Sequence, residues 1–426
     1  MRRGTFDLTS PGWAVAVAIA ILTSFGLASI YVTDTHYNVG QDGPANAARQ
    51  AVRLIAGIAL AIVVLRIGYQ RVAGFSYSIF ALAVVLLIPL AVAKVSGTDF
   101  GGLITPRNGA YRWIQLPGFL LQPSEFMKVA FVIALAWYLR YRNNYRRLGG
   151  LILPFAISVI PLVLILLEPD LGTALLLVPV VFMMLFVAGA RVRHLVAIAL
   201  VGLALTPIAW RYAHTYQRLR VTSLLLQNDT LRDAVITHPE KYKAVATRRQ
   251  AIEWSASSGY QLVHSKNAIG SGGLFGHGWG KGIYVDTSLL PDRHNDFIFA
   301  IVAHQWGLIG CLLVLACYVV IVIAGVRIAS VTTEPFARLL AVGIVTLIAT
   351  QAFISVAMSV GLMPITGMTL PFVSYGGSSV LCNFVAVALL ISVSQHRPYL
   401  LTRKPFVFGR EETEQTTRAP TPVSQH

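Results

Sequence analysis

A single acid beside a long apolar run is the first candidate for chemistry. Asp296 follows Arg293 and His294 and directly precedes the apolar run that begins at Phe297. Partial removal from water is expected to raise the pKa of this carboxyl above its usual value of about 3.9 and to make it a better proton acceptor. The alternative is an N-cap role, for which Asp is a favoured residue. Spacing leaves both interpretations open.

Two further acidic segments lie at the ends of apolar runs. Glu125 and Lys128 stand one helical turn apart after Pro123, a residue typical of a helix start, so they can pair on one helix face. A structural ion pair is the alternative to a functional one. Between the next two apolar runs, Glu168 and Asp170 flank a proline, and capping of the following helix by Asp170 is the simplest role.

Two segments are rich in glycine, proline or hydroxyl residues. The first, 270–282, lacks the residues of a phosphate-binding P-loop at Phe275 and Gly282. It is expected to be a tightly turning loop of exposed backbone that can approach a ligand or the membrane surface closely. The second, 363–379, is expected to be a hairpin that lines a pocket, because non-helical backbone at membrane depth survives only where protein or a cavity shelters it.

These residues must be positioned by membrane helices. The chain is 55% hydrophobic and 12% charged, whereas soluble domains carry about 25% charged residues. A span needs about 20 apolar residues. Runs that meet this requirement lie near 13–32, 51–68, 75–95, 124–141, 150–168, 173–190, 194–212, 297–326, 337–362 and 375–394. The sequence therefore predicts an all-α polytopic membrane protein of about ten transmembrane helices.

Short basic loops set the predicted orientation. Positive residues gather at 70–71, 140–147, 191–194, 327–338 and 396–410, which places both termini in the cytoplasm. The expected organisation is a cytoplasmic N-terminus (1–12), a membrane domain (13–395) and a partly disordered cytoplasmic tail (396–426). The one large outer loop, 213–296, joins the seventh and eighth spans.

That outer loop is expected to contain a helix that starts at Thr237, with Glu240 completing the cap. The basic and apolar segment that follows fits a membrane surface or a partner. Packing on its own loop is the alternative.

Charge and cysteine usage exclude other classes. The net charge of +16 is explained by basic cytoplasmic loops, and no basic, aromatic-interleaved soluble module indicates nucleic-acid binding. Cys311, Cys317 and Cys382 lie in apolar runs without metal-ligand spacing, so they are expected to be small buried side chains.

Several motifs in order resemble the SEDS family (shape, elongation, division and sporulation proteins), from the first span to the tenth. They are 109–114 (Gly-Ala-Tyr-Arg-Trp-Ile), 122–128, 168–173, the glycine-rich loop, 296–300 and 371–379. Residues 264–266 and the pair Arg293 and His294 are closer to the RodA, elongation-type pattern than to the FtsW pattern.

The resemblance implies a peptidoglycan glycosyltransferase that polymerises lipid II at the bacterial cytoplasmic membrane. It also implies a class B penicillin-binding protein as partner, with other elongation-complex membrane proteins. Asp296 matches the family's essential outer-loop acid, Trp113 an important aromatic, and Glu125 with Lys128 the polar pair of the fourth span.

A mechanism follows as a hypothesis. Asp296 acts as general base in one inverting transfer, and positive charge stabilises the leaving diphosphate. Arg112, Lys128, Lys266 and Arg293 are the candidate cations, and a divalent cation (Mg²⁺ or Mn²⁺) is an open addition. Trp113 either stacks on a sugar or packs the loop. The other predicted substrate contacts are Glu125, His294 and Ser378.

The sequence departs from the family pattern in places. His304, Gln305 and Trp306 stand where two acids before Leu-Gly are usual, Asp292 and Asn295 replace the commoner Glu and Thr, Thr369 replaces a proline, and an insertion lies between Arg220 and Tyr260. His304 is expected to be a packed helix residue.

Two other functions compete. A lipid-precursor flippase or transporter would also suit ten helices with buried polar pairs, although no inverted repeat is visible. A noncatalytic scaffold of the cell-wall synthesis complex is the third interpretation.

Overall fold

The computed structural model describes residues 10–37, 45–97, 101–104, 106, 110–117, 119–141, 144–212, 215–242, 245–287, 289–290 and 294–395. Within them, seven helices are long and apolar enough to cross a membrane, and two shorter apolar helices accompany them. The N-terminal residues 1–9 and the predicted disordered tail, 396–426, lie outside the described residues.

Each of the ten predicted spans overlaps one helix, which confirms the polytopic all-α fold. These helices are α1 (Pro11–Tyr37), α2 (Ala45–Ile67), α4 (Ser76–Ser96), α5 (Pro123–Leu139), α6 (Ile152–Leu167), α7 (Leu171–Val187), α8 (Val192–Tyr212), α14 (Ile298–Val331), α15 (Pro335–Ser359) and α16 (Ser378–Gln395). The last begins later than predicted, because Tyr375–Gly377 belong to the preceding hairpin. Short elements α3 (Tyr69–Gly74), η1 (Asn144–Arg146) and η2 (Leu148–Leu151) lie in the connections.

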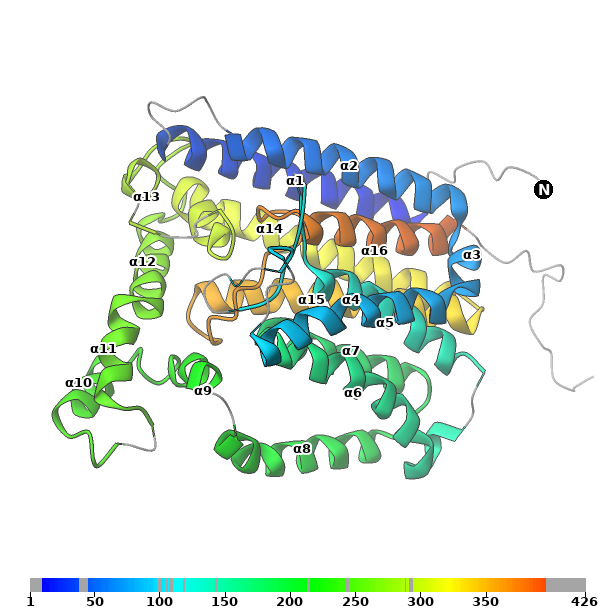
Figure 1. The fold of residues 1–426 in the computed structure, drawn as a ribbon. Helices are drawn as coiled ribbons and strands as arrows, with labels where there is room; N and C mark the ends of the chain where they lie inside the picture. Colours follow the sequence, from blue (N-terminus) through cyan, green and yellow to red (C-terminus); the bar gives the residue numbers. More distant parts are fainter. Residues whose placement is uncertain are drawn as a thin grey trace, which may run out of the picture. The chain divides into compact units, whose positions relative to one another are not determined.

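Helices α5 and α15 form the centre of the bundle. Almost every side chain of α5 is buried, and α5 packs against α4, α7 and α15 (Figure 1). This central place is expected for a helix that carries Glu125 and Lys128, because charged groups are costly in contact with lipid. By contrast α8 exposes most of its length.

Helix α14 is interrupted at Gly307, and the glycine-rich loop donates hydrogen bonds to backbone carbonyls beside this interruption. Gly307 has φ +63°, and the carbonyls of His304 and Gln305 accept hydrogen bonds from the N–H groups of His277 and Gly278, both at 3.0 Å. A Cβ at Gly276 would collide with the Gln305 carbonyl. The loop therefore packs part of its backbone against α14, while Leu274, Phe275 and Trp279 expose their side chains. Its approach to a ligand or to the membrane surface stays a prediction.

Five helices lie in the described residues of the large outer loop: α9 (Thr215–Thr222), α10 (Asp229–Thr237), α11 (Arg248–Ala256), α12 (Ser258–Ser271) and α13 (Ile283–Asp286). The predicted helix start at Thr237 is wrong, since Thr237 ends α10. Pro239 disfavours helical backbone at His238, which explains the stop. The next helix, α11, instead starts from a capping box of Thr247 and Gln250.

Helix α11 packs on its own loop. Trp254 and Ala251 are buried in a small cluster with Leu226, Val235 and Ala246. This packing favours the second of the two interpretations of the basic segment.

The hairpin between α15 and α16 is sheltered on several sides, as predicted. The Tyr318 hydroxyl of α14 donates to the Pro371 carbonyl at 2.5 Å. Gly26 of α1 approaches so closely that a Cβ there would lie 2.7 Å from Val373 Cα. This non-helical segment is therefore held by helices from both ends of the chain.

Candidate active site

Side chains from segments far apart in the sequence line one cavity of about 280 Å³. Its walls come from α2, the segment before α5 with the first turn of that helix, the α6–α7 turn with the first turn of α7, the residues before α14, α15, and the hairpin with the first turn of α16. Of the predicted site residues, the cavity brings together Arg112, Trp113, Glu125, Asp296 and Ser378.

Asp296 lines this cavity from the segment that precedes α14. The N-cap of α14 is Phe297, and no side chain caps that helix, so the structure does not support the N-cap alternative. A Cβ on Gly367 would lie 3.3 Å from Asp296 Oδ2 and 4.0 Å from Arg220 Nη2. Gly367, with φ +73°, thus leaves room beside the carboxylate that a larger residue would fill.

The hairpin holds the segment that carries Asp296. The Ser374 hydroxyl donates to the Asn295 carbonyl at 2.7 Å, and the Tyr375 N–H donates to the His294 carbonyl at 2.9 Å. The rings of His294 and Tyr375 meet edge to face, 5.7 Å between centroids. These contacts on consecutive residues fix the backbone directly before the acid.

A short antiparallel pair of strands positions the aromatic and the arginine. Strands β1 (Ile114–Leu116) and β2 (Phe119–Leu121), which were not predicted, follow Arg112 and Trp113 directly. Buried Arg112 donates to the backbone carbonyls of Glu168 and Pro169, and its Nη1 lies 4.0 Å from Asp170 Oδ1. Trp113 lines the cavity half-buried.

The pKa values of the two acids of the α6–α7 turn are shifted in opposite directions. Asp170 caps α7 as predicted, accepting hydrogen bonds from the Thr173 N–H and hydroxyl. Burial raises the pKa of Asp170, but Arg112 and the bonds from Thr173 outweigh burial and leave this pKa lowered. Burial and the charge of Asp170 raise the pKa of Glu168 well above its ordinary value, and neither carboxyl oxygen of Glu168 has a hydrogen-bond partner.

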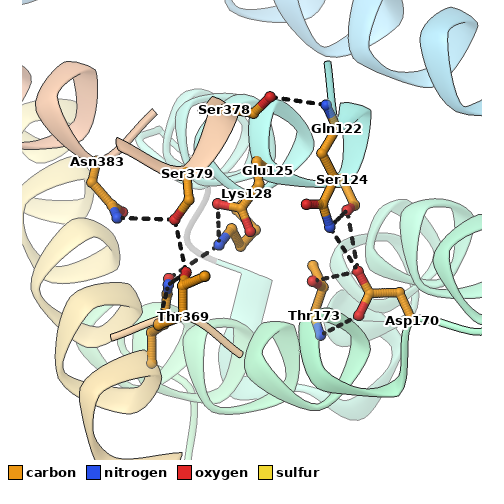
Figure 2. A network of polar contacts seen from close by, with 11 residues as sticks. Gln122, Ser124, Glu125, Lys128, Asp170, Thr173, Thr369, Ser378, Ser379 and Asn383 are labelled. Carbon is orange, nitrogen blue, oxygen red and sulfur yellow. Dashed lines mark hydrogen bonds and ion pairs between the residues drawn. The ribbon is translucent and has the colours of Figure 1, made fainter. Parts of the chain in front are cut away.

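Glu125 and Lys128 form the predicted pair. The Lys128 ammonium lies 2.8 Å from Glu125 Oε2 and donates to Gln351 Oε1 at 3.0 Å. Gln351 in turn donates to the Thr369 carbonyl at 3.0 Å, which links α5 to the hairpin. Figure 2 shows Glu125 and Lys128 between this contact and the Asp170 cluster.

Ser378 joins the hairpin to the strand pair. Its hydroxyl donates to the Leu120 carbonyl at 3.1 Å and accepts from the Gln122 N–H at 2.9 Å (Figure 2). Because these contacts occupy the hydroxyl, Ser378 shapes the cavity wall as well as lining it.

Three of the predicted site residues that the structure describes are not among the residues that line the cavity: Lys128, Lys266 and His294. Lys128 instead contacts Glu125, which does line it. Lys266, on the exposed side of α12, donates to Gln227 Oε1 at 3.3 Å. His294 lies behind Tyr375, which does line the cavity. Arg293 lies outside the described residues.

Sequence reasoning missed other lining residues, above all Arg53, Asn295 and Gln351. A signal existed for Arg53, because it is a charged residue inside the second apolar run, and such residues are functional candidates by default. Asn295 and Gln351 carry no comparable signal.

His304 and Gln305 are buried residues outside this cavity. The His304 Nδ1 lies 2.9 Å from the Ser271 hydroxyl, so its predicted role as a packed helix residue is confirmed. Among the residues that the structure describes, no three His, Cys, Asp or Glu side chains are grouped to hold a metal ion.

Comparison with known proteins places the chain among cell-wall synthesis proteins. The FtsW, RodA and SpoVE family profile, described as cell cycle protein, matches residues 13–399. The probable peptidoglycan glycosyltransferase FtsW of Trichlorobacter lovleyi is 31% identical over 92% of this chain and 95% of that protein. The peptidoglycan glycosyltransferase MrdB of Escherichia coli is 31% identical over 83% of this chain and 86% of its own length.

Similarity extends to a sporulation protein and to solved structures. Stage V sporulation protein E of Bacillus subtilis is 31% identical over 93% of this chain and all of its own. The crystal structure of Thermus thermophilus rod shape determining protein RodA matches with a TM-score of 0.63 at 25% identity, covering 92% of this chain and 98% of that one. A chain of a peptidoglycan synthase complex has the same fold, with a TM-score of 0.70 at 24% identity and coverage of 92% and 100%. The chain therefore belongs to the FtsW, RodA and SpoVE family of cell cycle proteins.

Proposed function

We propose that this chain, a glycosyltransferase of the FtsW, RodA and SpoVE family, polymerises lipid II with Asp296 as general base. One observation carries the proposal: a single cavity gathers Asp296, Trp113 and two arginines from distant segments. Two relatives carry the name peptidoglycan glycosyltransferase, which supports the reaction class.

The reaction requires one inversion at a sugar carbon. The donor sugar is linked to diphosphate in the α configuration, and the product linkage is β. Asp296 accepts the proton of the acceptor GlcNAc 4-hydroxyl as that oxygen bonds to the donor MurNAc C1. The C1–O bond breaks at the same carbon, and its electron pair leaves with the polyprenyl diphosphate. This leaving group is already a stable anion, so it needs positive charge rather than a strong acid.

A resident metal ion does not fit the acids around the cavity. Lys128 already neutralises Glu125 at 2.8 Å, and Asp170 faces Arg112 and accepts from Thr173. In the part of the chain that the structure describes, no three His, Cys, Asp or Glu side chains are grouped as ligands for a protein-held metal ion. A divalent cation bound to the lipid diphosphate stays a prediction, and the steps proposed for the protein's own residues do not depend on it.

Location and partner complete the proposal. The chain is a multi-pass membrane protein, and we place it in the bacterial cytoplasmic membrane with the cavity on the outer side. A class B penicillin-binding protein is the proposed partner, and the fold shared with a chain of a peptidoglycan synthase complex supports such an assembly. A role in elongation and cell shape stays a prediction, because FtsW, SpoVE and MrdB relatives are all 31% identical to this chain.

The decisive experiment is polymerisation of labelled lipid II by the purified protein with its partner. Asp296→Asn is expected to lower the rate about 10²- to 10⁴-fold, the usual worth of general-base catalysis. Asp233→Asn, at an exposed position on α10, is the matched control and should polymerise at the wild-type rate. Native polymerisation by Asp296→Asn would rule out the proposed base.

The same purified protein distinguishes the glycosyltransferase from a flippase and from a noncatalytic scaffold. A flippase would move lipid II across a vesicle bilayer without forming polymer. A scaffold would form none under any condition, and cells that carry Asp296→Asn would then grow normally.

A further inference from the structure

Arg53 is a cation inside the membrane domain that lines the cavity. It lies on α2, and its guanidinium carbon stands 4.4 Å above the centre of the Tyr375 ring. Its Nη1 is buried without a hydrogen-bond partner. A buried donor without a partner costs free energy, and more so on a charged group, so such a group calls for an explanation.

Two other basic groups that the structure describes in this region, Arg112 and Lys128, are already engaged by the protein. Arg112 donates to two backbone carbonyls and faces Asp170. Lys128 is paired with Glu125 and Gln351. In the described part of the chain, by contrast, no ion pair joins Arg53 to an acid, so its positive charge is available to a bound anion.

The surroundings of Arg53 keep its guanidinium in place. Gln50, one turn earlier on α2, donates to the Ser374 carbonyl and accepts from the Gly376 N–H, both at 3.3 Å. Gly377 lies so near that a Cβ there would stand 3.6 Å from Arg53 Nε. Contacts among α2, the hairpin and the Tyr375 ring hold the Arg53 side chain in place. Ligand binding therefore orders few further groups and costs little conformational entropy.

We propose that Arg53 binds the diphosphate of the lipid-linked donor and holds it as the leaving group. The planar guanidinium matches phosphate oxygens with two parallel N–H bonds. The sugars of the substrate carry no comparable charge density, so the diphosphate is the part that satisfies the buried donor. This inference rests on the proposed function and adds a substrate-binding residue to it.

Two measurements test Arg53, and they use the full-length protein in detergent. The first is the polymerisation rate over a range of lipid II concentrations, with the partner present. The second is binding of undecaprenyl diphosphate and undecaprenyl monophosphate, which needs no catalysis. The variants are Arg53→Gln and Arg53→Lys. Arg49→Gln is the matched control, because it removes the same charge from an exposed position one turn away on α2.

Arg53→Gln is expected to weaken binding of the diphosphate lipid roughly ten- to hundredfold, as for a charged hydrogen bond. It should raise KM for lipid II by a similar factor. Arg53→Lys keeps the charge but loses the paired geometry, so an intermediate loss is expected. Arg49→Gln should match the wild type in both assays. Arg53→Lys also remains informative if Arg53→Gln fails to fold.

The outcomes separate this inference from the proposed function. Normal KM and normal diphosphate binding in both Arg53 variants, in a preparation whose wild type polymerises lipid II, would overturn the inference and leave the function intact. Arg53-dependent diphosphate binding by a wild type that makes no polymer would support the inference and reject the function. An equal loss of monophosphate and diphosphate binding would also contradict it, since a bidentate diphosphate contact predicts a larger effect on the diphosphate.

Discussion

At the scale of single residues, the polar groups near the cavity fall into two kinds. Lys128 and Arg112 have their charges met by protein groups, as is usual for buried ions, because an unpaired one is strongly destabilising. Glu168 and Arg53 have buried polar atoms without hydrogen-bond partners. For Arg53, a substrate anion would supply the missing hydrogen-bond partner. Glu168 lies outside the cavity lining, and burial raises the pKa of its carboxyl.

Glu168 gives a prediction with a definite pH dependence. Its pKa is raised in the folded protein above the ordinary value of 4.5, so folding favours the protonated form. Stability is therefore lost as the pH rises from the unfolded pKa through the folded one. Glu168→Gln imitates the protonated acid and should raise the apparent Tm at pH 7, with a gain that vanishes near pH 4.

The control for this measurement is Glu253→Gln on the exposed face of α11. Thermal unfolding of both variants in detergent across pH 4 to 8 is the experiment. A gain for Glu168→Gln that does not change with pH would contradict the assigned cause.

At the scale of elements, the broken helix α14 and the glycine-rich loop act as one unit. The break at Gly307 releases backbone carbonyls inside the protein, and loop N–H groups satisfy them; in return, Leu308 N–H donates to the Gly273 carbonyl at 2.9 Å. Because Asp296 lies just before α14, these hydrogen bonds fix the direction of the helix relative to the cavity. Glycines are needed in the loop because its backbone contacts the backbone of α14.

Gly276→Ala should break this unit. The new Cβ would collide with the Gln305 carbonyl, and Gly276 has φ +75°, which other residues rarely adopt. Overpacking of this kind costs about 1 to 3 kcal/mol, so a lower apparent Tm and reduced polymerisation are expected.

Gly270→Ala, which has open space around its Cβ position within α12, is the matched control and should not lower the apparent Tm or the polymerisation rate. If Gly276→Ala melts at the wild-type temperature, the loop does not stabilise the break.

At the scale of the whole molecule, the cavity depends on contacts between distant parts of the chain. Arg53 from α2 meets Tyr375 from the last hairpin, and Gln122 meets Ser378. Figure 1 shows the outer-loop helices α10 to α12 at one end of the bundle and α3 at the other. The helices of the predicted outer loop and the connection with basic residues 70–71 thus lie at opposite ends, and the side of the membrane that each end faces stays a prediction.

Sidedness is testable by cysteine labelling. In a background without Cys311, Cys317 and Cys382, a membrane-impermeant maleimide should label Glu240→Cys in intact spheroplasts and Gly149→Cys only after permeabilisation. Both positions are exposed, so accessibility within the protein is matched. Labelling of Gly149→Cys in intact cells would invert the predicted topology.

The membrane helices and several pairs of neighbouring residues could be predicted from the amino-acid sequence. Apolar length fixes the spans, and one-turn spacing fixes the contact of Glu125 with Lys128, because both depend only on neighbours along the chain. The cap at Asp170 was predictable for the same reason. The helix start at Thr237 failed because the local cap pattern ignored the effect of Pro239 on the preceding residue.

Which polar residues share a cavity depends on the packing of the helices against one another. Arg53 and Gln351 come close to Asp296 through the packing of α2, α15 and the hairpin, and no periodicity encodes that meeting. The same packing left Lys266 at another surface and turned the glycine-rich loop toward α14. Local sequence patterns specify which polar groups lie at membrane depth. Whether such a group is paired within the protein or can bind a ligand depends on neighbours hundreds of residues away in the sequence.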